Sequence, residues 1–274
     1  MKIKQYFIHG ILIFLLGMMA FLGHKAYNQA ILYEALTTEM VGYQGAEEQA
    51  KLQLERLAKS VLGDFYTDEK KIHLDKMKSK KDKARQEAKK YTLYFMFCLG
   101  LIVLSFFVIS SRMFILFGAI GAMETLFLGL ISPILMITIH KDIEYLGDIV
   151  LSFESKGVIG SIVKLVEEGD LLVAMVILIF SVLVPIAKVS SLLFASVFMQ
   201  SSFAHDIVKF FKVLGKWSMV DVFVVAVFLV YLTANKGDIS RAEVEVGLYF
   251  FLAYVLISML LSLSADKMLQ KLKA

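Results

Sequence analysis

Two opposite charges inside apolar stretches are the residues of this sequence best suited to chemistry. Lys188 follows Pro185, and Asp221 follows Trp217, in two separate runs of mostly apolar residues. A charge in hydrocarbon costs at least about 2.5–3.5 kcal/mol by insertion scales, so it is retained when it pairs with an opposite charge or when it has a function. We therefore predict that Lys188 and Asp221 belong to a functional site. The alternative is that Lys188 snorkels to a membrane surface and that Asp221 stabilises a helix N-terminus.

A third charge and several hydroxyls could extend this polar core. If the apolar stretch at 171–197 enters the membrane at its first residue, Lys188 lies ~26 Å down a hydrocarbon core of ~30 Å. Lys188 is therefore near the inner edge of the core, and Asp221, four residues past Trp217, lies about 6 Å from that inner edge, so the two are at matching depth and could pair across neighbouring helices. Glu124 is expected near the midplane of another span. The hydroxyl side chains predicted to line a polar path are those of Ser132, Ser181, Ser190, Thr125 and Tyr254.

The motifs of common enzymes and metal sites are missing from the sequence. It contains no P-loop, no H-E-x-x-H and no G-x-S-x-G, and its five histidines have no ligand spacing. The single cysteine, Cys98, excludes a disulfide framework and a Cys-x-x-Cys metal pair. We therefore expect no cofactor, no metal and no nucleic-acid partner, and we do not expect an enzyme.

The composition predicts an integral membrane protein. Hydrophobic residues make up 58% of the 274 residues, more than one soluble core can hide. Six segments are long and apolar enough to cross a hydrocarbon core, so we predict an all-α protein with six transmembrane helices. The predicted spans are 5–23, 91–110, 114–139, 171–197, 217–234 and 246–264. We divide the chain into an N-terminal two-span region, 1–112, and a four-span module, 113–274.

The short basic loops predict the orientation. Lys and Arg residues near the chain ends and between alternate spans fall on one side, which places both termini in the cytoplasm. The stretch at 70–90 is an exception, because its ten Lys and Arg residues would then lie outside. The first span could also be a signal peptide, but Phe21 occupies the −3 position of the nearest cleavage site, so we expect an uncleaved anchor.

Two segments outside the spans are predicted to be helical. The segment 24–90 is expected to form an extracytoplasmic hairpin, with one helix at about 46–61 and a second running from 68 into the membrane at 91. Its Lys-rich face is either a solvated surface or a site for an acidic partner or anionic lipid. Residues 142–168 are predicted to form amphipathic surface helices, with apolar stripes from Ile143 to Phe153 and from Val158 to Val166. They either close the bundle or guide an amphipathic substrate.

Three stretches of the sequence resemble a known family. They are Ser132-Pro133, the run from Ser181 to Lys188, and the run Gly215-Lys216-Trp217-Ser218-Met219-Val220-Asp221-Val222-Phe223-Val224-Val225-Ala226. Together they are similar to the paraquat-inducible protein A family, which includes the lipophilic envelope-spanning tunnel protein A, over about 113–264. The resemblance implies an inner-membrane protein that works with mammalian-cell-entry (MCE) domain proteins, whose periplasmic tunnels carry phospholipid between two membranes.

The sequence also departs from the family pattern. Larger members carry two copies of the module and zinc ribbons built from Cys-x-x-Cys pairs, whereas this chain has one copy and one cysteine. A homodimer could replace the missing module. The resemblance thus predicts an inner-membrane component that passes phospholipid to or from an MCE-type tunnel. The alternative is a scaffold that anchors or gates such a partner without transporting lipid.

Overall fold

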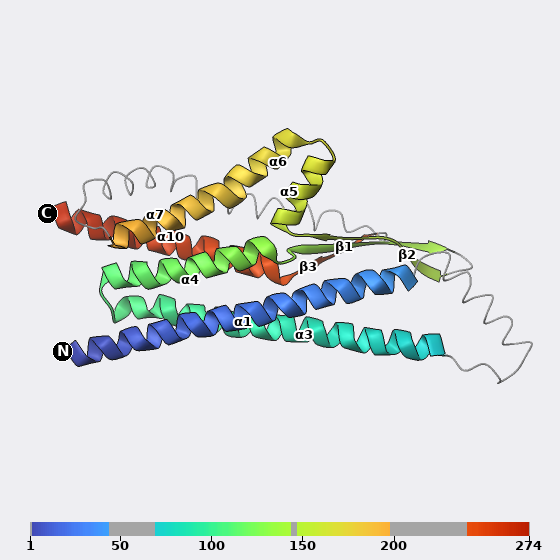
Figure 1. The fold of residues 1–274 in the computed structure, drawn as a ribbon, viewed down its shortest axis with the longest axis horizontal. Coiled ribbons are helices and arrows are strands. Elements are labelled where there is room, and N and C mark those ends of the chain that lie inside the picture. Colours follow the sequence, from blue (N-terminus) through green and yellow to red (C-terminus); the bar gives the residue numbers. More distant parts are fainter. Residues whose placement is uncertain (1, 44–68, 144–146, 198–239, 274) are drawn as a thin grey trace, which may run out of the picture.

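The fold is built around long helices and a small sheet (Figure 1). The computed structural model describes residues 2–43, 69–143, 147–197 and 240–273. Its helices are α1 (Lys2–Tyr43), α3 (Glu69–Leu104), α4 (Ser111–Ile131), α5 (Val158–Glu167), α6 (Leu171–Ile177), α7 (Val184–Val197) and α10 (Val246–Lys273), with the short segments η1 (Ser105–Phe107) and η2 (Leu178–Leu183). The strands are β1 (Leu135–Ile143), β2 (Gly147–Lys156) and β3 (Ser240–Val244).

The helices α1 and α3 form a long antiparallel pair that extends beyond the rest of the bundle (Figure 1). Small buried side chains, Ala26 and Ala30 on α1 and Ala84 and Ala88 on α3, let the two backbones approach closely. The prediction of one helix running from 68 into the membrane is confirmed by α3. The helix α1 continues past the predicted end of the first span, and the helix expected at 46–61 lies outside the described residues.

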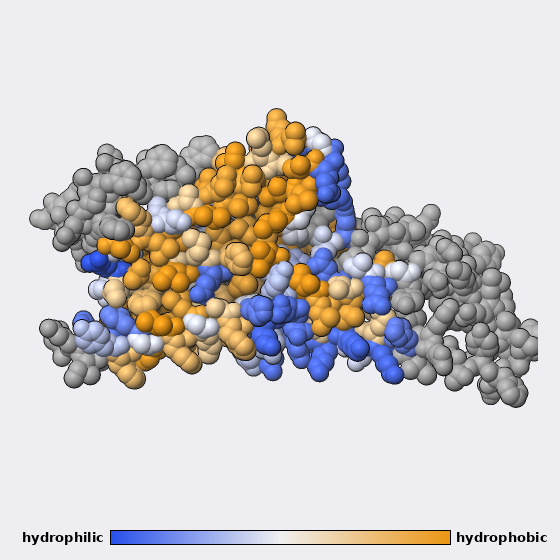
Figure 2. Space-filling model, in the orientation of Figure 1, coloured by the Kyte–Doolittle hydropathy of each residue, from blue (hydrophilic) through white to orange (hydrophobic). Residues whose placement is uncertain are grey.

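Five helical stretches in the described residues are long and apolar enough to cross a membrane. They are Gln5–Gly42, Asp75–Phe107, Ser111–Ile131, Leu171–Val197 and Val246–Ala265. Apolar side chains gather over α6, α7 and the half of the bundle nearest the termini, whereas charged side chains gather over the outer part of α3 (Figure 2). These features indicate a multi-pass membrane protein. The predicted span at 217–234 lies outside the described residues.

The third span is shorter than the predicted 114–139. The helix α4 ends at Ile131 because Pro133 has no N–H to donate and disfavours a helical conformation at Ser132. Ser132 is extended, with φ −79° and ψ 151°, and the chain then enters β1. The expectation that residues 132–139 complete a transmembrane helix was therefore wrong.

A three-stranded antiparallel sheet corrects the all-α prediction. The strand order is β2-β1-β3, with Leu135 opposite both Lys156 and Val244. The stripe from Ile143 to Phe153, predicted to be an amphipathic helix, belongs to this sheet. Ile149, Leu151 and Phe153 also recur at every second residue, the strand period, and short apolar segments rich in β-branched residues satisfy both patterns. The second predicted stripe is confirmed as a helix, α5.

The helices α4 and α10 pack antiparallel through glycines. A Cβ on Gly118 would lie 2.5 Å from the side chain of Leu261, and one on Gly129 would lie 2.9 Å from the backbone nitrogen of Phe251. At the other end of α4, Arg112 donates hydrogen bonds to the carbonyls of Ser196 and Val197, which caps the C-terminus of α7. The three helices α4, α7 and α10 therefore form one packed unit.

Candidate functional site

Lys188 lies inside the bundle. It shares one face of α7 with Val189 and Leu192, and only 6% of the residue is exposed. Its Nζ donates a hydrogen bond to the Ser258 hydroxyl of α10 over 3.2 Å. This burial argues against snorkelling, because the ammonium is held between two apolar helices rather than at their ends. Asp221, the predicted partner, lies outside the described residues, as does Trp217.

The backbone around Lys188 is irregular, and Pro185 explains why. Proline lacks an N–H and clashes with the carbonyl four residues earlier, so a regular helix cannot continue through it. The segment before Pro185 is a π-helix, η2, which includes Ser181. This local departure from α-helical hydrogen bonding accommodates the proline. The fully buried Tyr254 donates its hydroxyl to the Pro185 carbonyl over 3.4 Å. A polar contact thus joins α7 to α10 one turn before Lys188.

The structure does not bring Glu124 to Lys188 within the described residues. Glu124 follows Phe117 by seven residues, two helical turns, so both lie on one face of α4. The ring of Phe117 contacts the ring of His9 on α1, which places Glu124 on the α1 side, whereas Lys188 faces α10. One carboxylate oxygen of Glu124, Oε2, is buried with no hydrogen-bond partner among the described residues. In the described part of the bundle, Glu124 and Lys188 therefore lie in two separate places and not in the single polar core that was predicted.

Ser132 occupies a tight junction rather than the polar path that was predicted for it. The residue is fully buried, and its hydroxyl has no hydrogen-bond partner in the described part of the chain. Its carbonyl lies against two glycines: a Cβ on Gly157 would come within 3.1 Å of this oxygen, and one on Gly247 within 2.6 Å. The backbone N–H of Gly247 donates to the Pro133 carbonyl over 2.9 Å. Side chains larger than hydrogen are excluded where α10 begins.

A polar cluster that the sequence analysis missed joins the α1–α3 pair to the sheet. We call Tyr33, Arg85, Glu243 and Glu245 the sheet cluster. The Tyr33 hydroxyl donates to Glu243 Oε2 over 3.0 Å, and Arg85 Nη2 lies 2.8 Å from the same oxygen. The Arg85 guanidinium also lies 5.5 Å from the centre of the Tyr33 ring. One carboxylate thus ties α1 and α3 to β3.

Glu245 is the buried acid of the sheet cluster. The residue is 3% exposed, and its Oε1 has no hydrogen-bond partner among the described residues. The pKa of Glu245 is raised to about 7, chiefly because the carboxyl is buried and also because of the charge of Glu243, although Arg85 and Lys89 act in the opposite direction. The two acids are separated by one residue, so an extended chain places them on the same side, but their partners on α1 and α3 are distant in sequence.

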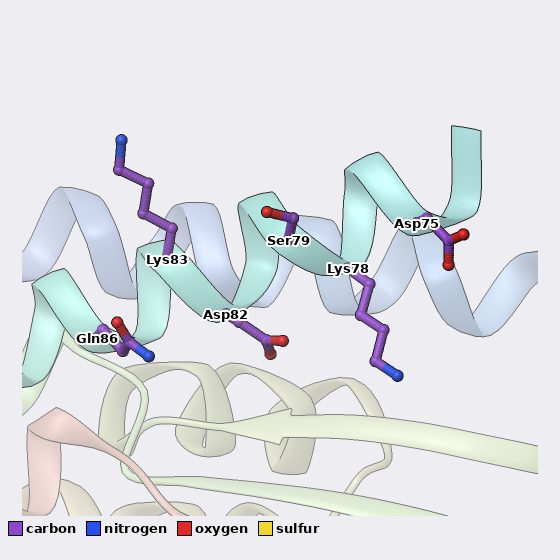
Figure 3. A pocket seen from close by; sticks show the side chains of 6 residues that line it. All are labelled: Asp75, Lys78, Ser79, Asp82, Lys83 and Gln86. Atoms are coloured by element: carbon purple, nitrogen blue, oxygen red, sulfur yellow. The ribbon is translucent and has the colours of Figure 1, made fainter. Parts of the chain in front are cut away.

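The outer part of α3 presents a mixed polar face. Lys76, Lys80 and Lys83 are exposed, as a solvated surface requires. A surface pocket of about 450 Å³ follows this part of the helix (Figure 3). Its lining alternates acids and lysines and consists of Asp75, Lys78, Ser79, Asp82, Lys83 and Gln86. In the described ranges no three His, Cys, Asp or Glu side chains are placed to hold a metal ion.

Residues 149–270 match the family described as Paraquat-inducible protein A. A probable intermembrane transport protein from Haemophilus influenzae is 30% identical over 117 residues, which cover 40% of this chain and 28% of that relative. The chain therefore spans less than a third of that curated relative's length. No solved structure matches the chain. The matched region includes Lys188, Asp221 and Glu245, whereas Glu124 and Ser132 precede it.

Proposed function

We propose that this chain, whose residues 149–270 match the paraquat-inducible protein A family, passes phospholipid between the bacterial inner membrane and an MCE-type periplasmic tunnel protein. The name of the Haemophilus relative, a probable intermembrane transport protein, supports a role in transport. In this proposal both termini are cytoplasmic, and the sheet and the outer parts of α1 and α3 are periplasmic. Two copies of the chain could supply the two modules of larger family members.

The observation that carries the proposal is the burial of Lys188 between membrane-spanning helices. Removing an ammonium from water costs free energy even where it has partners, so leucine or methionine would serve a purely structural helix at least as well at this position. Its hydrogen bond to Ser258 and the π-helix before Pro185 place the charge at an irregular point of the span. Such points in membrane helices are typical of sites that bind a substrate or change conformation.

The α1–α3 pair supports the choice of a periplasmic partner. It extends beyond the other spans, and its outer surface is charged rather than apolar (Figures 1 and 2). The polar pocket on α3 in Figure 3 offers both carboxylates and ammonium groups to a protein surface. A scaffold that anchors the tunnel without moving lipid would use the same surface, so this observation alone does not separate the two functions.

The experiment is a purification of the full-length chain from its native membrane after mild crosslinking, followed by identification of bound proteins and lipids. The proposal expects an MCE-domain protein and phospholipid above the level retained by an unrelated multi-pass protein of similar span number. Recovery of the MCE protein with only background lipid would favour the scaffold. Recovery of neither would refute both functions.

A further inference from the structure

An apolar groove runs along the membrane-spanning parts of α3 and α10. One section, of about 430 Å³, lies between the α3 residues from Met96 to Leu104 and the α10 residues from Ala253 to Leu260. A second, of about 290 Å³, continues from Val103 to Lys267. The two sections share Val103, Leu104 and Leu260 in their linings, so they form one groove. We call it the α3–α10 groove.

The dimensions of the groove fit one leaflet of a bilayer. From Ala253 to Lys267 is fourteen residues of α10, or about 21 Å of helix. One leaflet with its headgroup region contributes roughly half of a bilayer of ~40–45 Å, of which about 15 Å is hydrocarbon. Both helices are among the membrane-spanning candidates, so the occupant of the groove must be apolar over most of its length.

The two ends of the groove differ in chemistry. At the end nearest the chain termini the lining includes Lys267 and Ser264, whose hydroxyl donates to the Leu260 carbonyl, whereas the section near Ala253 is apolar throughout. Arg112 is in the same region of the bundle, but its guanidinium donates to the carbonyls of Ser196 and Val197. A cation at the headgroup level attracts phosphate. The groove thus presents an apolar channel that ends at a positive charge.

We propose that the α3–α10 groove binds one acyl chain of a phospholipid, with the phosphate of the headgroup paired with the Lys267 ammonium. The lipid comes from the leaflet at the end where both termini lie (Figure 1). Charge complementarity at Lys267 selects a phospholipid over an uncharged apolar helix as the occupant. Because α3 precedes the region that matches the family, this site is built partly by the portion of the chain outside the match. As a holding site for transported lipid, it rests on the proposed function.

Gly100 makes the site testable without disturbing the fold. It lines the groove, and a Cβ added there meets no atom within 4 Å. Gly100→Leu would therefore fill the groove with a side chain while improving helix propensity. Gly17 on α1 has equally open space but does not line the groove, so Gly17→Leu is the matched control.

The test places a photocrosslinking amino acid at Leu256, which lines the groove and is 54% exposed, or at Met259, which is 47% exposed and does not line it. The full chain is reconstituted in vesicles of phosphatidylethanolamine and phosphatidylglycerol, and lipid adducts are measured by mass spectrometry. We expect more adduct at Leu256 than at Met259, a fall to the Met259 level in Gly100→Leu, and no change in Gly17→Leu. Lys267→Gln should lower the phosphatidylglycerol adduct about fivefold.

Two results would overturn the proposal. Equal adducts at Leu256 and Met259 would show only lipid exchanging around the perimeter. Crosslinks from Leu256 to a second copy of the chain would show that a helix, not an acyl chain, fills the groove. A focused lipid adduct in a chain that fails to transfer lipid would support the site and count against the proposed function, so the two failures are distinguishable.

Discussion

Replacing the buried acid of the sheet cluster should change the pH dependence of stability. In Glu245→Gln the side chain keeps its shape and loses its ability to ionise. Burial raises the pKa of Glu245 from 4.5 to about 7, so the folded protein holds this proton more tightly than the unfolded chain does. The groups that face it are Arg85 and Lys89 of α3, Glu243 of β3 and Glu34 of α1.

The size and sign of the effect follow from that shift. The stabilisation from the bound proton is fully present below about pH 4.5 and is lost as the pH rises through about 7. A shift from 4.5 to about 7 corresponds to roughly 3 kcal/mol at 1.36 kcal/mol per unit. Above pH 7, Glu245→Gln should therefore be more stable than the parent by up to roughly 3 kcal/mol, or several degrees in Tm. Near pH 4 the two proteins should unfold at the same temperature.

The assay is thermal unfolding of the purified full-length protein in detergent between pH 4 and pH 8. Glu243→Gln is the matched control, because this acid is partly exposed and accepts from Tyr33 and Arg85. It should lower the unfolding temperature slightly at neutral pH, since a partly exposed ion pair contributes about 1 kcal/mol or less. Parallel pH profiles for the parent and Glu245→Gln would refute the assignment of Glu245 as a buried acid with a raised pKa.

Three further changes test other parts of the account. Lys188→Met should reach the membrane at parental levels but lose activity, because a neutral side chain fills the site without the charge; full complementation would make Lys188 structural. Gly247→Ala should lower Tm by several degrees, since its Cβ would lie 2.6 Å from a backbone oxygen, whereas Gly10→Ala, which has open space, should not; equal Tm values would show that the junction can yield. In a variant without the native cysteine, a cysteine at Glu167 should react with an impermeant thiol reagent added to intact spheroplasts and one at Lys267 should not; the reverse pattern would invert the proposed orientation.

Periodicity and length predicted the helices well where the bilayer decides the structure. The helix from 68 into the membrane, the start of the fourth span at Leu171 and the last span at 246–264 agree with α3, α6 and α10. The sequence also pointed to Lys188, because a cation in an apolar stretch is visible without any tertiary information. Its burial against Ser258 could not be derived, since it depends on how α7 and α10 pack.

The errors lie where local patterns are ambiguous or partners are distant in sequence. The stripe from Ile143 to Phe153 satisfies helix and strand periods alike, and only pairing with β1 decides between them. The sheet cluster joins residues about 50 and 210 positions from Tyr33, so no local signal could assemble it. Glu124 and Lys188 were grouped as charges inside apolar spans, and the packing of α4 against α1 places them on different sides.

Transfer of phospholipid by the reconstituted chain tests the central proposal most directly. Vesicles that contain the protein and a fluorescent phospholipid would be mixed with the purified MCE-domain partner, and lipid reaching the partner would be measured over time. The account predicts transfer well above protein-free vesicles for the parent and near background for Lys188→Met at equal reconstitution. Transfer that is equal with and without the chain, or equal in the parent and Lys188→Met, would contradict it.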